Sequence, residues 1–233
     1  MGRLTGQMAE LKAAEFDLST TAEVMRRTME ALRGMSELPV TAIKVPAGGG
    51  KAFELPGDDG ADYVKSFDGV ILAAAFCNAY WDKPYGTGGD QEPQCASRDG
   101  LSGWDAEGNE HNCRTCPRNR MGSKDGGRGK ACRNMVDLLV LMEGQALPVR
   151  LRVPTMSINN YSLYVARTLS PRGLQPWDVV TTFSLAGATN SGGINYSQIQ
   201  FGCAGTVDRE QVQALRAAVP MMIEGGGGQD AAE

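Results

Sequence analysis

The sequence predicts a mainly β protein of the α+β class, and three features of the chain support that prediction. Glycine makes up 30 of the 233 residues, which favours turns over a helical bundle. Short apolar runs, some alternating with polar residues, recur between prolines and glycines, as expected for strands. A glycine-rich segment with four cysteines interrupts these runs and has few aliphatic side chains. We therefore expect one core of strands that carries an insertion.

The predicted insertion spans residues 90–134, and its cysteines follow the spacing C-x17-C-x2-C-x15-C. The four residues are Cys95, Cys113, Cys116 and Cys132. A C-x-x-C turn places two thiolates on one side of the backbone, where they can fill two corners of a tetrahedron around Zn²⁺. Structural zinc contributes about 10 kcal/mol or more in small metal-dependent units. We predict a closed structural zinc site, with His111 as the alternative to Cys95 and Trp104 packed over it.

Three other uses of these cysteines fit the sequence less well. Disulfides suit secreted chains, but the N-terminus MGRLTGQMAELKAAEF lacks an apolar signal segment, which favours a reducing cytoplasm. Redox chemistry at a C-x-x-C pair is typical of a βαβ unit, which is not indicated here. A zinc deaminase needs H-x-E and then P-C-x-x-C, whereas Cys113 stands two residues after His111 and the proline follows Cys116. Of the two other cysteines, Cys77 lies inside a long apolar run and is expected in the core.

Charge is unevenly distributed along a chain whose formal net charge is −4. Residues 51–111 carry twelve acidic and four basic side chains, whereas residues 114–133 carry seven basic side chains and one acidic side chain. Such a basic run is either a solvated loop or a surface that binds an anionic partner. No apolar run approaches the ~20 residues of a membrane-spanning helix.

The predicted elements follow from periodicity and from capping residues. Residues 7–34 form a helical arm, broken near 17–20, with a capping box from Thr20 to Glu23 and an end at Gly34. The arm packs either on the core or on a neighbouring subunit. A helix over 157–169 ends at 171–173, and Asp208 caps a final helix that Pro220 stops. Strands are expected at 41–45, 51–55, 67–81, 135–142, 147–154, 178–186 and 194–205.

Two groups of residues have the chemistry to hold an unpaired nucleic acid. Arg150 and Arg152 alternate with apolar residues, so one strand face presents both guanidinium groups, either to phosphates or simply to solvent. Aromatic residues supply the second group, since they stack on unpaired bases at ~1–3 kcal/mol per base, or else pack within the protein. These aromatic residues are Tyr80, Trp81, Tyr85 and Tyr196.

Together these features resemble the single-stranded-DNA-binding proteins of bacteriophages, which have an OB-type barrel interrupted by a zinc ribbon. The resemblance covers about residues 65–205. It is carried by PQCASRDG at 93–100, CRTCPRNRMGSKDGGRGKAC at 113–132, LPVRLRVP at 147–154 and WDVVTTFSLAGATNSGGINYSQIQF at 177–201. It implies an OB-like domain over 37–220, interrupted by the zinc ribbon, between the helical arm of residues 1–36 and a flexible tail of residues 221–233. The tail lacks the strongly acidic tip with which many such proteins recruit replication partners.

The expected function is sequence-independent binding of single-stranded DNA in phage DNA replication or recombination, in the cytoplasm of a bacterial host. Replication or recombination proteins would be further partners, and a homo-oligomer is an open alternative. Zinc would be structural, and the DNA contacts would come from Arg150, Arg152, Lys124, Arg128, Lys130, Tyr80, Trp81, Tyr85 and Tyr196. The alternative is a zinc-ribbon adaptor that docks on another protein of a replication or transcription complex. We do not expect an enzyme, since the sequence has no P-loop, no recognisable motif of paired carboxylates and a single histidine.

Overall fold

The computed structural model describes residues 18–32, 40–57, 60–82, 92–124, 127, 129–143, 145, 147–190 and 192–224. Within these residues, nine strands form one mixed sheet, and two further strands form a separate hairpin. Three α-helices accompany them. The prediction of a mainly β chain of the α+β class is confirmed. None of the helices in these ranges is both long enough and apolar enough to cross a membrane.

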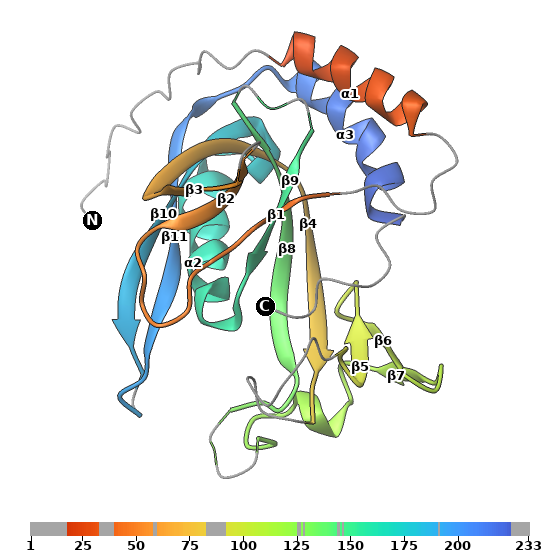
Figure 1. Cartoon of the computed structure of the whole chain (residues 1–233), viewed down its shortest axis with the longest axis vertical. Helices are drawn as coiled ribbons and strands as arrows, with labels where there is room; N and C mark the ends of the chain where they lie inside the picture. The colour runs from red at the N-terminus through yellow and green to blue at the C-terminus, as the bar shows by residue number, and fades with distance from the viewer. Residues whose placement is uncertain are drawn as a thin grey trace, which may run out of the picture.

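The elements are distributed along the whole described chain (Figure 1). The large sheet contains β1 (Ala42–Ile43), β4 (Ser66–Tyr80), β5 (Cys95–Ser97), β6 (Ser102–Asp105), β7 (Glu110–Asn112), β8 (Arg133–Met142), β9 (Val149–Val153), β10 (Val179–Thr189) and β11 (Asn195–Thr206). The hairpin contains β2 (Phe53–Gly57) and β3 (Gly60–Val64), and the helices are α1 (Ser19–Ala31), α2 (Ile158–Leu163) and α3 (Arg209–Glu224).

Strand β4 joins the core of the sheet to the predicted insertion. Its first residues pair with β10, most of its length pairs with β8, and its last three residues pair with β5. Because β4 and β8 are antiparallel neighbours, residues 81–132 form an excursion from one strand to its direct partner. The predicted insertion therefore begins and ends at the same end of one strand pair.

The two edges of the sheet core approach each other. Strand β9 pairs with β8, and β1 adds to β9 in parallel. On the other side, β10 pairs along its whole length with β11. An isolated bridge joins Ala47 to Tyr196 of β11, and the Ser197 hydroxyl donates to the Gly50 carbonyl oxygen at 2.8 Å. The segment that follows β1 is therefore held against β11.

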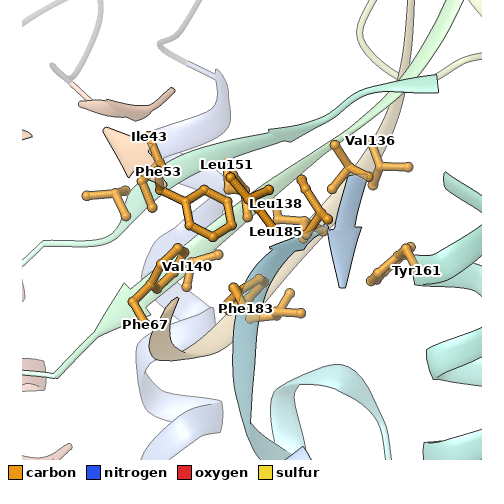
Figure 2. Packing of buried hydrophobic residues seen from close by; sticks show 14 residues of the cluster. Ile43, Phe53, Phe67, Val136, Leu138, Val140, Leu151, Tyr161, Phe183 and Leu185 are labelled. Atoms are coloured by element: carbon orange, nitrogen blue, oxygen red, sulfur yellow. The ribbon is translucent and has the colours of Figure 1, made fainter. Parts of the chain in front are cut away.

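The main apolar core lies on one face of β4 and β8, which we call the inner face. Phe67 stacks on Phe183 with ring centroids 4.8 Å apart, and Phe53 meets Phe67 edge-on at 5.0 Å. Figure 2 shows Val136, Leu138 and Val140 of β8 pointing into this cluster, which β9 joins through its buried valines and leucine. The predicted alternation of β9 is confirmed, since these apolar residues are buried and the two arginines between them are not.

A second apolar cluster covers the opposite, outer face of the same strands. Leu139 and Leu141 of β8 lie there, and α1 and α3 pack over them side by side (Figure 1). Met25 of α1 and Leu215 of α3 are almost fully buried in this cluster. The N-terminal arm, as far as it is described, therefore packs on the core of its own chain.

Several predicted helix boundaries differ from the structure. Helix α1 begins at Ser19 after Leu18, which makes no side-chain cap, so the predicted capping box does not start the helix. Helix α3 continues through Pro220, because one proline removes only one backbone hydrogen bond and need not end a helix. The Asp208 cap is confirmed, since its Oδ1 accepts hydrogen bonds from the backbone N–H groups of Glu210 and Gln211 in the first turn of the helix.

The remaining helix prediction is confirmed in part. Residues 158–163 are α-helical, 164–169 form a wider π-helical turn, and Gly173 with φ of 66° ends the segment. The predicted helix over 7–17, its end at Gly34 and the tail after residue 224 lie outside the described residues.

Candidate functional site

The excursion between β4 and β8 contains most of the predicted site, and we call residues 92–132 the flap. Its strands β5, β6 and β7 form an antiparallel meander beside the end of β4, away from α1 and α3 (Figure 1). Carboxylates hold its turns: Asp99 Oδ1 accepts from the N–H groups of Leu101 and Ser102 at 2.7 and 2.9 Å. Asp105 Oδ1 accepts from Asn109 N–H at 2.7 Å in the next turn. Polar turns, rather than apolar packing, therefore shape the meander.

The structure brings all four predicted cysteine ligands to one cavity of about 310 Å³. Gly103 of β6 lies against this cavity, and a Cβ atom there would approach Cys95 Sγ to 3.0 Å and Cys113 Sγ to 3.3 Å. Any larger residue at position 103 would therefore crowd the thiols of Cys95 and Cys113. His111, the predicted alternative to Cys95, lines the same cavity.

Backbone hydrogen bonds bring the cysteines together across long sequence separations. The Cys113 N–H donates to the Leu101 carbonyl oxygen at 2.8 Å, and the Cys132 N–H donates to the Arg118 carbonyl oxygen at 2.9 Å. A short helical turn, Pro117–Asn119, follows Cys116, whose carbonyl oxygen accepts from Asn119 N–H at 3.1 Å. The C-x-x-C segment therefore forms a tight turn onto which Cys132 folds back.

The thiols influence one another electrostatically. Burial raises the pKa of Cys132 to about 11, and the neighbouring thiols of Cys113, Cys116 and Cys95 act in the same direction. Burial also raises the pKa of Cys95, again with contributions from Cys113 and Cys116. All six cysteines of the chain are free thiols. In the described ranges, however, no three or more histidine, cysteine, aspartate or glutamate side chains are arranged to hold a metal ion as they stand.

The four thiols thus share a cavity without forming a finished tetrahedron. Their chemistry fits zinc, which binds thiolates at about 2.3 Å, provided that the thiols lose their protons and draw together.

The strand register places His111 and an acidic neighbour on the cavity side of the meander. Cys95 pairs with Asp105, and Gly103 pairs with His111, so all four face the same way. His111 Nε2 lies 2.7 Å from Asp105 Oδ2, and this hydrogen bond is the main reason why the pKa of Asp105 falls to about 2. Trp104 lies on the other side of the meander and is 55% exposed, so its expected packing over the site is wrong.

A network of amides connects the flap to β4 and β8. Asn134 Nδ2 of β8 donates to Asn78 Oδ1 of β4 and, at 3.0 Å, to Asn119 Oδ1 in the flap. Asn119 Nδ2 in turn donates to the Cys113 carbonyl oxygen at 2.8 Å. Lys130 Nζ donates to Asn119 Oδ1 and Asn134 Oδ1 at 3.1 and 2.8 Å. Lys130, predicted to contact DNA, is therefore already hydrogen-bonded within the protein.

Two other predicted DNA contacts lie on the outer face of the sheet. Arg152 pairs in register with Asp137 of β8, and its Nε and one terminal nitrogen donate to the Asp137 carboxylate at 2.8 and 2.9 Å. Arg150 lies in the same row and is half-buried. The sequence correctly predicted that the two arginines share one face of the strand, but it did not predict that Asp137 of the neighbouring strand binds Arg152.

The predicted aromatic residues are divided between the two faces. Tyr80 lines the cavity, and Arg118 of the flap stacks on its ring at 4.1 Å. Trp81 packs on the outer face against Cys77 and Met135, and Arg133 lies over its ring at 4.9 Å. Sequence reasoning missed both arginine partners, whose only signal was their place in the basic run.

The other predicted contacts are dispersed. Tyr196 is half-buried beside the Ala47 bridge, and Lys124 is exposed on the flap. Tyr85 and Arg128 lie outside the described residues.

Among the residues that the structure describes, the flap carries most of the exposed cations that are not paired with carboxylates. Ion pairs are made elsewhere, for example between Arg26 and Glu23 of α1 and between Arg209 and Asp178. In the described part of the chain, no carboxylate lies within 4.0 Å of a charged nitrogen of nine exposed residues. Six of them lie in the flap or at its junction with β8, namely Arg98, Arg114, Arg118, Arg120, Lys124 and Arg133, and the other three are Lys51, Lys65 and Arg167.

Comparisons of the chain with protein-family models, with curated proteins and with solved structures find no match to any of them. The site is therefore interpreted from its own geometry. That geometry combines a shared cysteine cavity, a rigid connection to the sheet and a dense group of exposed cations beside aromatic rings.

Proposed function

We propose that this chain binds single-stranded DNA without sequence preference, as a non-enzymatic protein of phage DNA replication or recombination. The observation that carries the proposal is the set of six exposed flap cations that have no carboxylate partner among the described residues, in a chain whose net charge is −4. A solvated loop would gain from nearby carboxylates, of which this chain has many. Leaving the cations without such partners favours a partner that brings its own negative charge.

The aromatic residues beside these cations favour an unpaired strand over a duplex. Arg118 on Tyr80 and Arg133 on Trp81 each place a guanidinium group on a ring at the junction of flap and sheet. Arginine and aromatic groups together hold phosphates and stack on unpaired bases, and every base offers a face for stacking. Such contacts do not read base edges, so binding would be tolerant of sequence.

In this proposal the sheet is an OB-like barrel and the flap is its zinc ribbon. Zinc would be held by Cys95, Cys113, Cys116 and Cys132, with His111 beside them in the same cavity. The ion would supply folding free energy to the flap and no catalytic chemistry, since four thiolates leave no open coordination position. The protein itself contributes the backbone hydrogen bonds that bring the thiols together, and a glycine at position 103 that leaves room for the thiols of Cys95 and Cys113.

The test measures metal content and oligonucleotide affinity on one preparation of the full chain. We expect stoichiometric zinc, tight binding of labelled poly-dT at low salt, and a steep loss of affinity as salt rises. Each neutralised phosphate of a single strand contributes about 0.7 to the slope of log K against log salt. Absence of binding at low salt, or binding that does not respond to salt, contradicts the proposal.

A charge-matched pair of variants makes the test specific to the flap. Arg114→Ala combined with Arg120→Ala removes two exposed flap cations, and we expect the salt slope to fall by about 0.7 for each lost contact. Lys65→Ala combined with Arg167→Ala removes the same charge from exposed positions outside the flap, and affinity should stay close to that of the wild type.

The alternative is a protein-docking adaptor, and one observation favours it. The flap exposes three large apolar side chains, Leu101, Trp104 and Met121, the last of them 72% exposed. Exposed apolar groups of this size are typical of protein interfaces when they form one patch. A chain that contains zinc but does not bind poly-dT at low salt would support the adaptor.

A further inference from the structure

The two faces of the β4–β8 pair differ in what they offer to a nucleic acid strand. We infer that single-stranded DNA lies on the inner face, with Phe76 as an unpredicted base-stacking residue next to the Tyr80–Arg118 pair. This inference rests on the proposed function and adds the path of the strand to it. The sequence had assigned phosphate binding to Arg150 and Arg152, which the structure places on the outer face.

Strand register fixes the side on which Phe76 lies. Phe76 pairs with Val136, a member of the main core, and Asn78 pairs with Asn134. Tyr80 pairs with Cys95, which lines the cysteine cavity. Since paired residues of antiparallel strands share a face, Phe76, Asn78 and Tyr80 form one row from the core to the flap.

Phe76 is exposed to solvent, although a large apolar residue in the middle of a strand is expected to be buried. Its side chain is 51% exposed although it lies inside a long strand whose other large apolar residues are buried. Its neighbour in the row, Ala74, is small and exposed, which leaves room beside the ring. A large apolar side chain exposed in the middle of a sheet is an informative exception to burial.

The flap passes closely beside Phe76 without covering it. Gly100 has φ of 70°, and a Cβ atom there would lie 3.3 Å from Phe76 Cβ. The Asn78 side chain holds this turn by donating to the Gly100 carbonyl oxygen at 3.3 Å. A glycine at this position keeps the backbone near the strand while leaving the outer part of the ring accessible.

A cation lies at the flap end of this row, where Arg118 stacks on Tyr80. Phe76 and Tyr80 are separated by about 13 Å, given a rise of ~3.3 Å per residue in a strand. The inner face therefore presents two rings, one of them with a guanidinium group on it, which suits an extended polyanion with unpaired bases.

The outer face is less suitable for the same ligand. Asp137 lies at its centre and binds Arg152, so a phosphate there would meet a carboxylate. Trp81 is half-buried against Cys77, Ala79 and Met135. The carboxylate on the outer face therefore favours the inner face for a polyanion.

The experiment compares matched aromatic and arginine variants of the full zinc-loaded chain. Phe76→Ala is paired with Trp104→Ala, a similarly exposed aromatic residue on the far side of the meander. Arg118→Ala is paired with Arg167→Ala, which removes the same charge from an exposed position outside the flap. The readouts are poly-dT affinity and its salt slope, with circular dichroism and zinc content as folding controls.

We expect Phe76→Ala to weaken poly-dT binding at least about fivefold without changing the salt slope, because it removes stacking and not charge. Arg118→Ala should weaken binding and lower the slope by about 0.7. Trp104→Ala and Arg167→Ala should stay within about twofold of the wild type. Phe76→Leu, which preserves apolar packing but has no aromatic face, should lose affinity like the alanine variant.

Three outcomes overturn the inference, and they differ in what they leave standing. If the wild type binds poly-dT, and both Phe76 variants bind equally well, the inner-face path is wrong while the proposed function stands. The same conclusion follows if Arg118→Ala binds poly-dT as tightly as Arg167→Ala does. If the wild type fails to bind poly-dT at low salt, the proposed function itself fails.

Discussion

The sheet core and the flap share strands β4 and β8, yet they are stabilised by different interactions. In the core, aromatic and aliphatic side chains such as Phe53, Phe183 and Leu138 are fully buried. In the flap, the buried residues include thiols and a serine, while Leu101 and Met121 are exposed. The flap therefore depends on thiols, carboxylate-held turns and amide hydrogen bonds, where the core depends on apolar burial.

This difference shows why one chain can contain both kinds of structure. Burial of a large apolar side chain contributes about 1.5–3 kcal/mol, and the core collects many such contributions. The flap cannot do so, and each polar hydrogen bond contributes only about 0.5–1.5 kcal/mol net. We expect the two regions to respond differently to mutation and pH, with the sheet able to remain folded when the flap is loosened.

The largest expected effect comes from removing an aromatic ring in the core. Phe183 is fully buried, stacks on Phe67 and meets Phe201 edge-on with centroids 5.7 Å apart. Phe183→Ala should lower the free energy of unfolding by about 3–5 kcal/mol, since it removes apolar burial and leaves a cavity. Urea unfolding followed by circular dichroism measures this loss.

A flap aromatic residue serves as the control. Trp104→Ala should change the free energy of unfolding by no more than about 0.5 kcal/mol, because most of its ring is already in solvent. Equal losses in the two variants would contradict the contrast between an apolar core and a polar flap.

The sequence predicted most of the sheet because its strands have simple patterns. Strand β9 alternates strictly, and the apolar runs that became β4 and β8 are long enough to be recognised without context. The cysteine spacing correctly identified four residues that share a cavity, because the C-x-x-C turn is local and the chain on either side is long enough for Cys95 and Cys132 to return to it.

What the sequence could not predict depends on contacts between distant residues. Asp137 lies 15 positions from Arg152, and no periodicity indicates that they bind each other. Phe76 looks like any core residue in its apolar run, and only the folded structure shows that it is 51% exposed although it pairs with the buried Val136. The amide network likewise joins asparagines from two strands and a turn, each unremarkable in its own segment.

That network connects the two regions, so its loss should have an intermediate effect. Asn134→Ala removes the partner of Asn78, which is 7% exposed, and two of the contacts that hold Asn119 and Lys130. Leaving a buried amide unsatisfied costs about 1–3 kcal/mol. We expect a loss of this size in urea unfolding and faster hydrogen exchange in the flap than in β10 and β11.

An exposed asparagine provides the comparison for this variant. Asn159→Ala alters a surface position of α2 and should leave both measurements nearly unchanged. If Asn134→Ala speeds exchange equally throughout the sheet, the network supports the whole fold and not the junction with the flap.

The smallest expected effect on stability at neutral pH comes from replacing Tyr161, and this effect changes at alkaline pH. Burial raises the pKa of Tyr161 in α2 to about 12, and its ring packs on Phe201 beside the core. Because the fold favours the neutral phenol, this contribution to stability is complete below the ordinary pKa of about 10 and is lost as pH rises to about 12. The flap contains no tyrosine, so this loss belongs to the core side of the molecule.

Tyr161→Phe should therefore lie within about 1 kcal/mol of the wild type near neutral pH and lose less stability than the wild type at about pH 11. Urea midpoints at the two pH values measure the difference, and Tyr63→Phe, at a position that is 70% exposed, should follow the wild type throughout. Tyr164, whose pKa is also raised by burial, is present in every variant, so its ionisation lowers the stability of all of them equally at alkaline pH. Parallel decline of wild type and Tyr161→Phe would mean that ionisation of Tyr161 does not limit the core, and that alkaline loss begins elsewhere in the chain.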